Sequence, residues 1–299
     1  MDEKYVKLNS GFNNEVYFLP DKDKVLRISQ KGKTKAMVKQ ELKWMNFLYE
    51  NGVEVPHQEI GIESQEGMVE TYFQYIEGEH IDVTKVSNWN ETMFEQFGRI
   101  LGRMHALSKE FHANVIYRPK WTVENPDVFG MRNSLSPKIR DRYNDLMSKL
   151  LPFEISKTTF GLIHNDFHQG NFIINKDGTL TIIDFDDCSY NWFAQDIAVL
   201  FYHAYWQNTS FNGSSNNFAQ KFMNNVFKGY KTENFLHEDT VKQIPIFLKL
   251  REIYLHQLFT KAWDADNLED WQGYTLKKLE ENIMNQEPYV GIVDFSRYM

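Results

Sequence analysis

The sequence predicts an α+β fold in which a small strand-rich lobe precedes a larger, mainly helical lobe. Three observations predict it. Short β-prone runs flank a turn near the N-terminus, apolar residues recur at helical spacing from residue 91 onward, and a hairpin signal lies inside the helical part. We place residues 1–76 in the first lobe and 77–299 in the second, with the hinge near Gln74–Gly78.

The first lobe is predicted to be strands around one helix. Pro20–Asp23 is a turn signal between two β-prone runs, which favours a hairpin. The helical segment that follows ends at Asn51-Gly52, with Pro56 just beyond. The expected elements are strands over 16–19, 24–28 and 69–76 and a helix over 34–49.

The second lobe is predicted to be mostly helical. Phe94, Phe97, Leu101 and Met104 share one face of a helix over 91–108. Further helices are expected over 138–151 and from Asp196 to about Asn285, with a break at 208–217, while 119–137 is expected to be a loop. Two short strands, 172–174 and 180–183, are joined across Asp177-Gly178, which is a strong hairpin signal.

Composition narrows the class of protein. Apolar residues make up 42% and aromatic residues 15% of the chain, as in folded globular proteins. A net charge of -8 argues against a nucleic-acid binder. The single cysteine, Cys188, fits a reducing compartment. No apolar signal region follows Met1, and no apolar run has membrane-spanning length, so we expect a cytoplasmic protein without membrane contact.

One stretch carries most of the chemical information, namely His164–Asn171 and the Ile182–Asp186 segment behind it. An Asp at 166, an Asn at 171 and a second Asp at 184 keep the spacing that kinases use around a transferred phosphate. The loop follows an apolar run, and the hairpin returns Asp184 toward it. We therefore expect side chains that ligate metal or accept a proton to converge from one contiguous segment.

Chemistry assigns a role to each residue of this stretch. Asp166 is expected to accept or orient the proton of an attacking hydroxyl. Asn171 and Asp184 are expected to ligate magnesium, a hard ion that prefers oxygen. Asp186 is a candidate for one further ligand or a water contact, and His164 is expected to hold the loop backbone by hydrogen bonds.

A second constellation is expected in the first lobe. Glu41 lies on the apolar stripe of the predicted helix 34–49, where an unpaired carboxylate is costly. Arg27, in the preceding strand, is its expected partner, as in the cation–Glu pair of kinases. The alternative is a partly exposed Glu41 at the edge of the stripe and an unrelated surface arginine.

Other segments leave alternatives open. The Asn9–Asn14 segment, with Gly11 and Asn13, could offer backbone N–H groups to a phosphate or be a simple turn. His168 and Gln169 could face a nucleotide phosphate or solvent. Asp196 opens a helical run and could be its N-cap.

The segment 263–271 alternates acidic and aromatic side chains. These side chains could bind a cationic substrate through carboxylates and ring faces. A solvated acidic helix end is the favoured interpretation of the two.

These residues carry a family resemblance. The loop 164–171 resembles the His-Gly-Asp-Leu-His-x-x-Asn loop of the aminoglycoside phosphotransferase, choline kinase and homoserine kinase superfamily. Matching segments, over about residues 9–205, are Val25–Ile28, Glu41, Glu77–Glu79, Phe97–Leu107, Ile183–Asp187, Trp192 and Asp196–Ala198. Arg27 replaces the usual Lys and Asn165 replaces Gly, departures that bear on nucleotide geometry and on the loop backbone.

The resemblance implies a bilobal, protein-kinase-like fold that binds ATP and magnesium and transfers the γ-phosphate to a hydroxyl. By the same matching, Arg27 is the phosphate-side cation and Asp196 supports the catalytic loop. The backbone around Gln74 to Ile76 would hold the adenine.

The acceptor is not specified by the sequence. An aminoglycoside, a choline-like amine, a homoserine-like amino alcohol, a sugar or a protein Ser/Thr are the alternatives, and the oligomeric state is open. A nucleotide-binding regulator without catalysis is the competing class. The intact Asp166, Asn171 and Asp184 argue against it.

Overall fold

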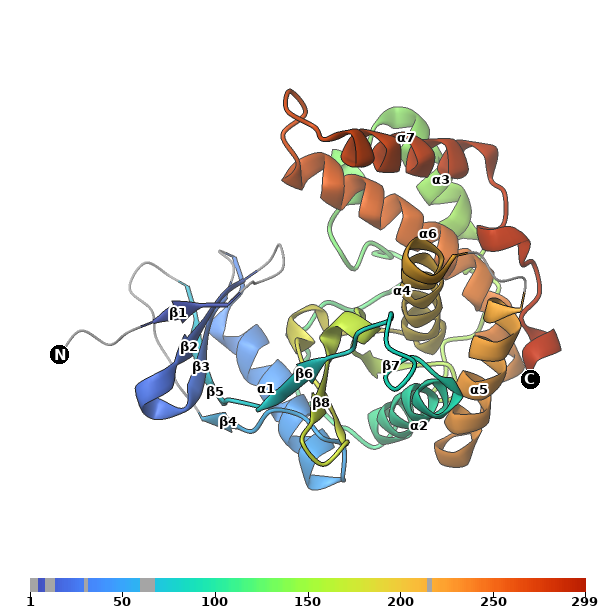
Figure 1. The fold of residues 1–299 in the computed structure, drawn as a ribbon. Coiled ribbons are helices and arrows are strands. Elements are labelled where there is room, and N and C mark those ends of the chain that lie inside the picture. The colour runs from blue at the N-terminus through green and yellow to red at the C-terminus, as the bar shows by residue number, and fades with distance from the viewer. Residues whose placement is uncertain (1–4, 9–13, 30–31, 60–67, 214–216) are drawn as a thin grey trace. The chain divides into compact units, whose positions relative to one another are not determined.

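The computed structural model describes residues 5–8, 14–29, 32–59, 68–213 and 217–299 (Figure 1). The chain divides into two compact units. The first comprises the described parts of Met1–Asp82 together with Glu110–Arg118 and Gly170–Cys188. The second comprises Val83–Lys109, Pro119–Gln169 and the described parts of Ser189–Met299.

The first unit contains an antiparallel five-stranded sheet in the order β1-β2-β3-β5-β4. The predicted hairpin is present, with Val16 opposite Arg27 and Arg27 opposite Thr71 on the next strand. The strands are β1 (Val6–Lys7), β2 (Glu15–Leu19), β3 (Lys24–Ile28), β4 (Gln58–Glu59) and β5 (Glu70–Gln74). The strand expected over 69–76 is therefore present and ends two residues early, at Gln74.

Helix α1 (Lys35–Glu50) belongs to the same unit. Thr34 is its N-cap, and the Thr34 hydroxyl accepts a hydrogen bond from the backbone N–H of Met37 (3.3 Å). Its buried face is the predicted apolar stripe, made of Val38, Leu42, Trp44, Met45 and Leu48, and it includes Glu41.

A second, three-stranded sheet completes the first unit, in the order β6-β8-β9. Its strands are β6 (Gly78–His80), β8 (Phe172–Asn175) and β9 (Leu180–Ile182). The predicted turn joins β8 to β9, and Gly178 takes φ 86°, a value that glycine adopts without strain. Phe172 pairs with Ile182, which brings the residues before β8 beside those after β9.

The second unit is mainly helical, and its helices are α2 (Glu91–Ser108), α3 (Pro137–Ser148), α4 (Phe193–Asn212), α5 (Phe218–Glu233), α6 (Glu238–Ala262) and α7 (Asp270–Asn285). A two-stranded sheet pairs β7 (Phe160–Ile163) with β10 (Ser189–Trp192). Among the described residues of both units, the 3-10 turns are η1 (Pro20–Lys22), η2 (Arg132–Ser134), η3 (Gln169–Asn171), η4 (Phe185–Asp187), η5 (Tyr289–Gly291) and η6 (Ser296–Tyr298). The predicted α+β class is confirmed, and the helix expected over 91–108 has those bounds.

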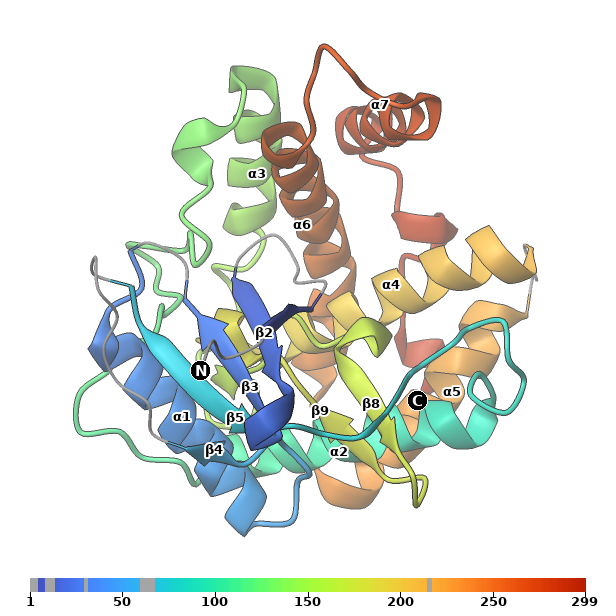
Figure 2. The same ribbon diagram turned by 60° about the vertical axis from the view of Figure 1, so that its left-hand side comes forward.

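Helices α2 and α5 lie side by side and cross closely (Figures 1 and 2). A Cβ at Gly229 of α5 would lie 1.9 Å from the Glu95 carbonyl oxygen, and one at Gly98 of α2 would lie 1.9 Å from that of Val226. Only glycine permits this approach. Helix α4, buried over most of its length, packs against α6, and α6 also packs against α7. No helix among the described residues is both long and apolar enough to span a membrane.

Candidate active site

One buried carboxylate holds the loop that follows β7. Asp196 lies in the first turn of α4, and it accepts hydrogen bonds from the backbone N–H groups of His164 (3.0 Å) and Asn165 (2.6 Å). His105 Nε2 lies 3.3 Å from Asp196, and its Nδ1 lies 3.0 Å from the Tyr230 hydroxyl. Because α4 begins at Phe193, the interpretation of Asp196 as its N-cap is wrong.

The conformation of Asn165 explains the departure from Gly in the loop sequence. Asn165 has φ 72°, in the left-handed region, which Asn tolerates better than most residues. The Asn191 side-chain amide donates to Asn165 Oδ1 (3.3 Å). His164 is fully buried, and its Nδ1 accepts the backbone N–H of Asp166 (3.3 Å), which is the structural contact expected of it.

Asp166 follows these residues, and 24% of its side chain is exposed. Its Oδ1 is 2.6 Å from Nη2 of Arg251 on α6, and its Oδ2 is 3.3 Å from Nε2 of His168. Burial alone would raise the pKa of Asp166. The neighbouring His168 and Arg251 outweigh burial and hold that pKa well below its usual value. Asp166 is therefore an ionised acceptor of hydrogen bonds at neutral pH.

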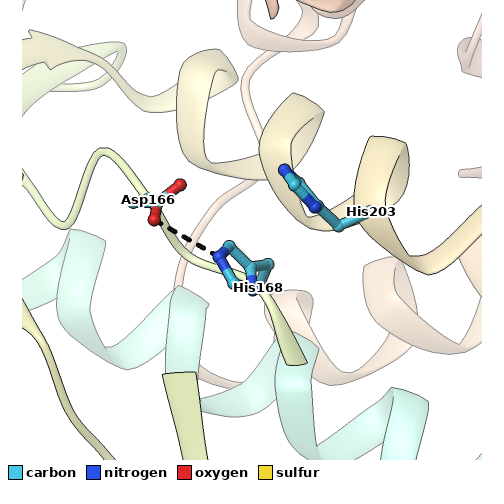
Figure 3. Close-up of side chains that lie close together, drawn as sticks. All are labelled: Asp166, His168 and His203. Atoms are coloured by element: carbon cyan, nitrogen blue, oxygen red, sulfur yellow. Dashed lines mark ion pairs between the residues drawn. The ribbon is translucent and has the colours of Figure 1, made fainter. Parts of the chain in front are cut away.

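Asp166, His168 and His203 could be mistaken for a metal site, because their ligand atoms all lie within 4.8 Å of one another (Figure 3). Arg251 argues against a metal ion here. Its Nη2 lies 2.6 Å from Asp166 Oδ1 and 2.7 Å from His203 Nε2. A guanidinium cation thus bonds to two of the three would-be ligands and would repel a metal ion.

The side chain of His168 contacts two other members of this group and is 18% exposed. Its ring stacks on His203 at 4.4 Å, and its Nε2 is directed at Asp166. Burial, together with the charges of Arg251 and His168, holds the pKa of His203 well below its usual value. His203 is therefore neutral, with Nε2 as an acceptor for Arg251. Gln169 is buried.

The two predicted metal ligands are neighbours within the first unit. Asn171 precedes β8 and Asp184 follows β9, and the Ile183 N–H donates to the Asn171 carbonyl (2.9 Å). Asp184 is exposed and has φ 64°, an uncommon backbone conformation for a non-glycine residue. Such strained positions cluster at functional sites.

Asp186, two residues further on, is buried among cations. Lys33 Nζ donates to its backbone carbonyl (2.7 Å) and lies 3.1 Å from its Oδ2. Arg118 also donates to that carbonyl and to the carbonyl of Cys188. Burial would raise the pKa of Asp186, but Arg27, Lys33 and Arg118 lower it. Burial raises the pKa of the neighbouring Cys188 thiol to about 12, which makes it an inert core residue.

The predicted pair of the first lobe forms. Arg27 Nη1 lies 2.6 Å from Glu41 Oε1, and both side chains are buried, so the alternative of a partly exposed Glu41 is wrong. Arg118 Nη1 lies 3.6 Å from the other Glu41 oxygen. One carboxylate therefore balances two buried guanidinium groups. The role of Arg27 toward a nucleotide stays a prediction.

Polar atoms of the first unit fit a phosphate ligand with a divalent cation. Among the described residues, Nε and Nη2 of Arg27 and Oδ1 of Asp186 are buried without a hydrogen-bond partner, while Asp186 Oδ2 is paired with Lys33. Buried polar atoms are nearly always paired, so these atoms indicate a missing partner. A guanidinium suits phosphate oxygens, and a carboxylate suits a hard cation.

The remaining predicted residues are less informative. Gly11 and Asn13 lie outside the described residues. Gln74 ends β5, where its N–H donates to the His57 carbonyl (2.9 Å), and Ile76 lies two residues beyond the strand. In the acidic-aromatic segment Glu269 is the N-cap of α7, and Asp264 accepts from the side chain of Asn267. These contacts agree with the helix-end interpretation.

Three buried residues were missed from the sequence: Arg118, His203 and Arg251. Arg118 lies in an irregular segment without periodicity. His203 and Arg251 lie in apolar helices, where their helical spacing resembles that of neighbouring core positions. No spacing signal links Arg251 to Asp166, which precedes it by 85 residues.

A kinase-like α+β fold with Asp166 and Asn171 in the segment between β7 and β8 defines the class of protein. The sequence model of the Phosphotransferase enzyme family matches residues 4–224. The chain belongs to the phosphotransferase enzyme family. The family resemblance stated from the sequence is thereby confirmed.

Among curated proteins, an amicoumacin kinase of Bacillus subtilis (strain 168) is 33% identical over 216 residues, or 70% of this chain. The match spans 63% of that relative's length. Among solved structures, the amicoumacin kinase hAmiN in complex with AMP-PNP, Ca2+ and Ami has a TM-score of 0.85 at 26% identity. That match covers 100% of this chain and 93% of the other.

A microcompartment-associated aminopropanol kinase has a TM-score of 0.71 at 17% identity, with 94% of this chain and 90% of the other covered. This similarity concerns the fold alone, and it confirms the predicted kinase-like architecture.

Proposed function

We propose that this protein is an ATP- and Mg2+-dependent kinase that transfers the γ-phosphate of ATP to a hydroxyl group of a small molecule. The observation that carries the proposal is the environment of Asp166, a partly exposed carboxylate kept ionised by Arg251 and His168. Such a group can orient an acceptor hydroxyl and accept its proton. A regulator without catalysis would not need it.

The chain's own residues have separate tasks in this mechanism. Asp166 accepts the hydrogen bond of the acceptor hydroxyl, and Asp196 fixes the loop backbone from which Asp166 projects. Arg27 would bind phosphate oxygens through its unpaired Nε and Nη2. Asn171 and Asp184 would hold Mg2+, and Asp186 is a further candidate. When bound, Mg2+ neutralises charge on the phosphate oxygens.

For the acceptor we propose amicoumacin or a related antibiotic. The curated relative and the solved structure with the 0.85 TM-score are both amicoumacin kinases. Choline, homoserine and aminoglycosides should be tested beside it, because the family resemblance implies acceptors of these kinds.

The test is an ADP-release screen of the purified protein with Mg-ATP against a panel of hydroxyl compounds that includes amicoumacin. We expect ADP release above the acceptor-free rate with at least one compound, and its loss in Asp166→Ala. Metal-dependent nucleotide binding without turnover on any acceptor would support the regulator instead. Full activity of Asp166→Ala would refute the assigned role of Asp166.

A further inference from the structure

We propose that Arg251 positions the Asp166 carboxylate for phosphoryl transfer and that His203 fixes Arg251 in turn. The proposal rests on the proposed function and adds residues to its catalytic machinery from α4 and α6. All four side chains, Asp166, His168, His203 and Arg251, lie within the second unit.

Arg251 has the geometry of a fixed clamp. Its side chain is 4% exposed. Nη2 donates to Asp166 Oδ1 (2.6 Å), Nε donates to His203 Nε2 (3.1 Å), and the guanidinium lies 4.8 Å from the Tyr254 ring centroid. A planar guanidinium with three contacts has one orientation, unlike a lysine ammonium. Arg251 therefore defines where Asp166 Oδ1 lies.

This contact controls the rotation of the carboxylate. The terminal torsion of an aspartate has a broad energy minimum, so an unrestrained carboxylate samples many orientations. With Oδ1 on Arg251, the carboxylate turns Oδ2 toward His168 at 3.3 Å, so both oxygens have defined directions. A reacting group misplaced by about 1 Å can lose about 10²-fold in rate.

His203 contributes as a neutral acceptor. The charged or titratable side chains that face it are Arg251 from α6, and His168 and Asp166 from the loop after β7. A protonated His203 could only donate, so it would lose its bond to Arg251 and repel that residue. The geometry thus requires the tautomer with the proton on Nδ1. The ring also stacks against His168, which limits the movement of the second partner of Asp166.

Activity measurements test the clamp with a matched control. Arg251→Ala should lower kcat about 10²-fold with little change in KM for ATP, because the lost contact positions Asp166. Added guanidinium ion should restore part of the rate, and Arg251→Lys should fall between Arg251→Ala and the wild type. The control is Lys249→Ala, which removes another buried cation of α6, paired with Glu252. It should lose stability but keep kcat per folded molecule, without any guanidinium effect.

A second readout does not depend on turnover. In 15N spectra of histidine-labelled protein, His203 should remain the neutral Nδ1–H tautomer at pH values well below the ordinary histidine pKa, and in Arg251→Ala it should titrate closer to the ordinary histidine range. A wild-type His203 that titrates normally would overturn the proposal. So would an Arg251→Ala rate equal to that of Lys249→Ala, or a loss that guanidinium leaves unchanged. If wild-type protein phosphorylates no acceptor, the proposed function fails, and the His203 spectra still decide the clamp.

Discussion

Glu41 shows how far single residues can be inferred from a pattern. Its place on the apolar stripe of α1 predicted a buried ion pair, and the proximity of β3 in sequence predicted Arg27 as the partner. Arg118 could not be predicted, because it comes from an irregular segment whose position depends on the tertiary fold. The structure shows that the predicted pair is part of a buried triad made of Arg27, Glu41 and Arg118.

Removing the charge of Glu41 should be strongly destabilising, since two buried guanidinium groups then lose the carboxylate that pairs with both of them. Glu41→Gln should lower the free energy of unfolding by about 3–5 kcal/mol, the usual effect of breaking a buried ion pair. Urea unfolding measures this loss in the free energy of unfolding. Glu281→Gln, in an exposed pair with Lys278 on α7, is the control and should leave the urea midpoint in place. Equal midpoints for the two variants would contradict the triad.

Asp184 allows a direct test of metal binding. Thermal unfolding of the wild type should shift upward with ATP and further with Mg2+, since ligand at 100 times its Kd adds about 2.7 kcal/mol. Asp184→Ala should lose the part of this thermal shift that depends on Mg2+. Asp177→Ala, in the exposed turn of the same hairpin, should keep it. An Asp184→Ala protein that retains the full Mg2+-dependent shift would remove Asp184 from the metal site.

Among the elements, α2 was predicted with its bounds because its apolar residues keep one helical face over five turns. Its partner was not predictable, since α5 follows it by more than a hundred residues. Glycines on both helices mark the crossing, but a helical glycine in a sequence does not show what approaches it. Which helix packs against α2 is determined by the tertiary fold.

A methyl group at the crossing should separate the two helices. Gly229→Ala places a Cβ against the Glu95 carbonyl and should cost roughly 1–3 kcal/mol of stability through overpacking. Gly273→Ala on α7 meets nothing within 4 Å and should gain about 0.5–1 kcal/mol through helix propensity. Urea unfolding of both variants measures the difference. A stabilised Gly229→Ala would contradict the close crossing.

For the whole molecule, the sequence pattern predicted the fold class, most elements and the loop that carries Asp166. It did so because local periodicity and turn residues agree with the fold over most of the chain. His203 and Arg251 could not be predicted from the sequence, because only the tertiary structure brings α4 and α6 to the loop after β7.

Buried neutral histidines should make the whole protein sensitive to mild acid. Burial lowers the pKa of His203 and of His256 in the folded state, so below about pH 6.5 the unfolded chain binds more protons. Stability should therefore fall as pH drops below about 6.5, by about 1.4 kcal/mol per pH unit for each such proton. Asp166 and Asp186, whose folded pKa values are lowered, add a further loss only below about pH 4.

Urea midpoints measured from about pH 7.5 to 5 test this dependence. His203→Gln should flatten the slope, and His112→Gln, at an exposed position, should not. A wild-type stability that stays level over this range would show that His203 is protonated in the folded state.

The central claim is that Asp166 serves the transfer of phosphate to a small-molecule hydroxyl. The most direct measurement incubates wild type and Asp166→Asn with γ-labelled Mg-ATP and amicoumacin and follows the label into the antibiotic by mass spectrometry. The account predicts a singly phosphorylated product from the wild type and a rate lower by at least about 10³-fold from the variant, whose side chain cannot accept the proton. Equal product formation by the two proteins would contradict it.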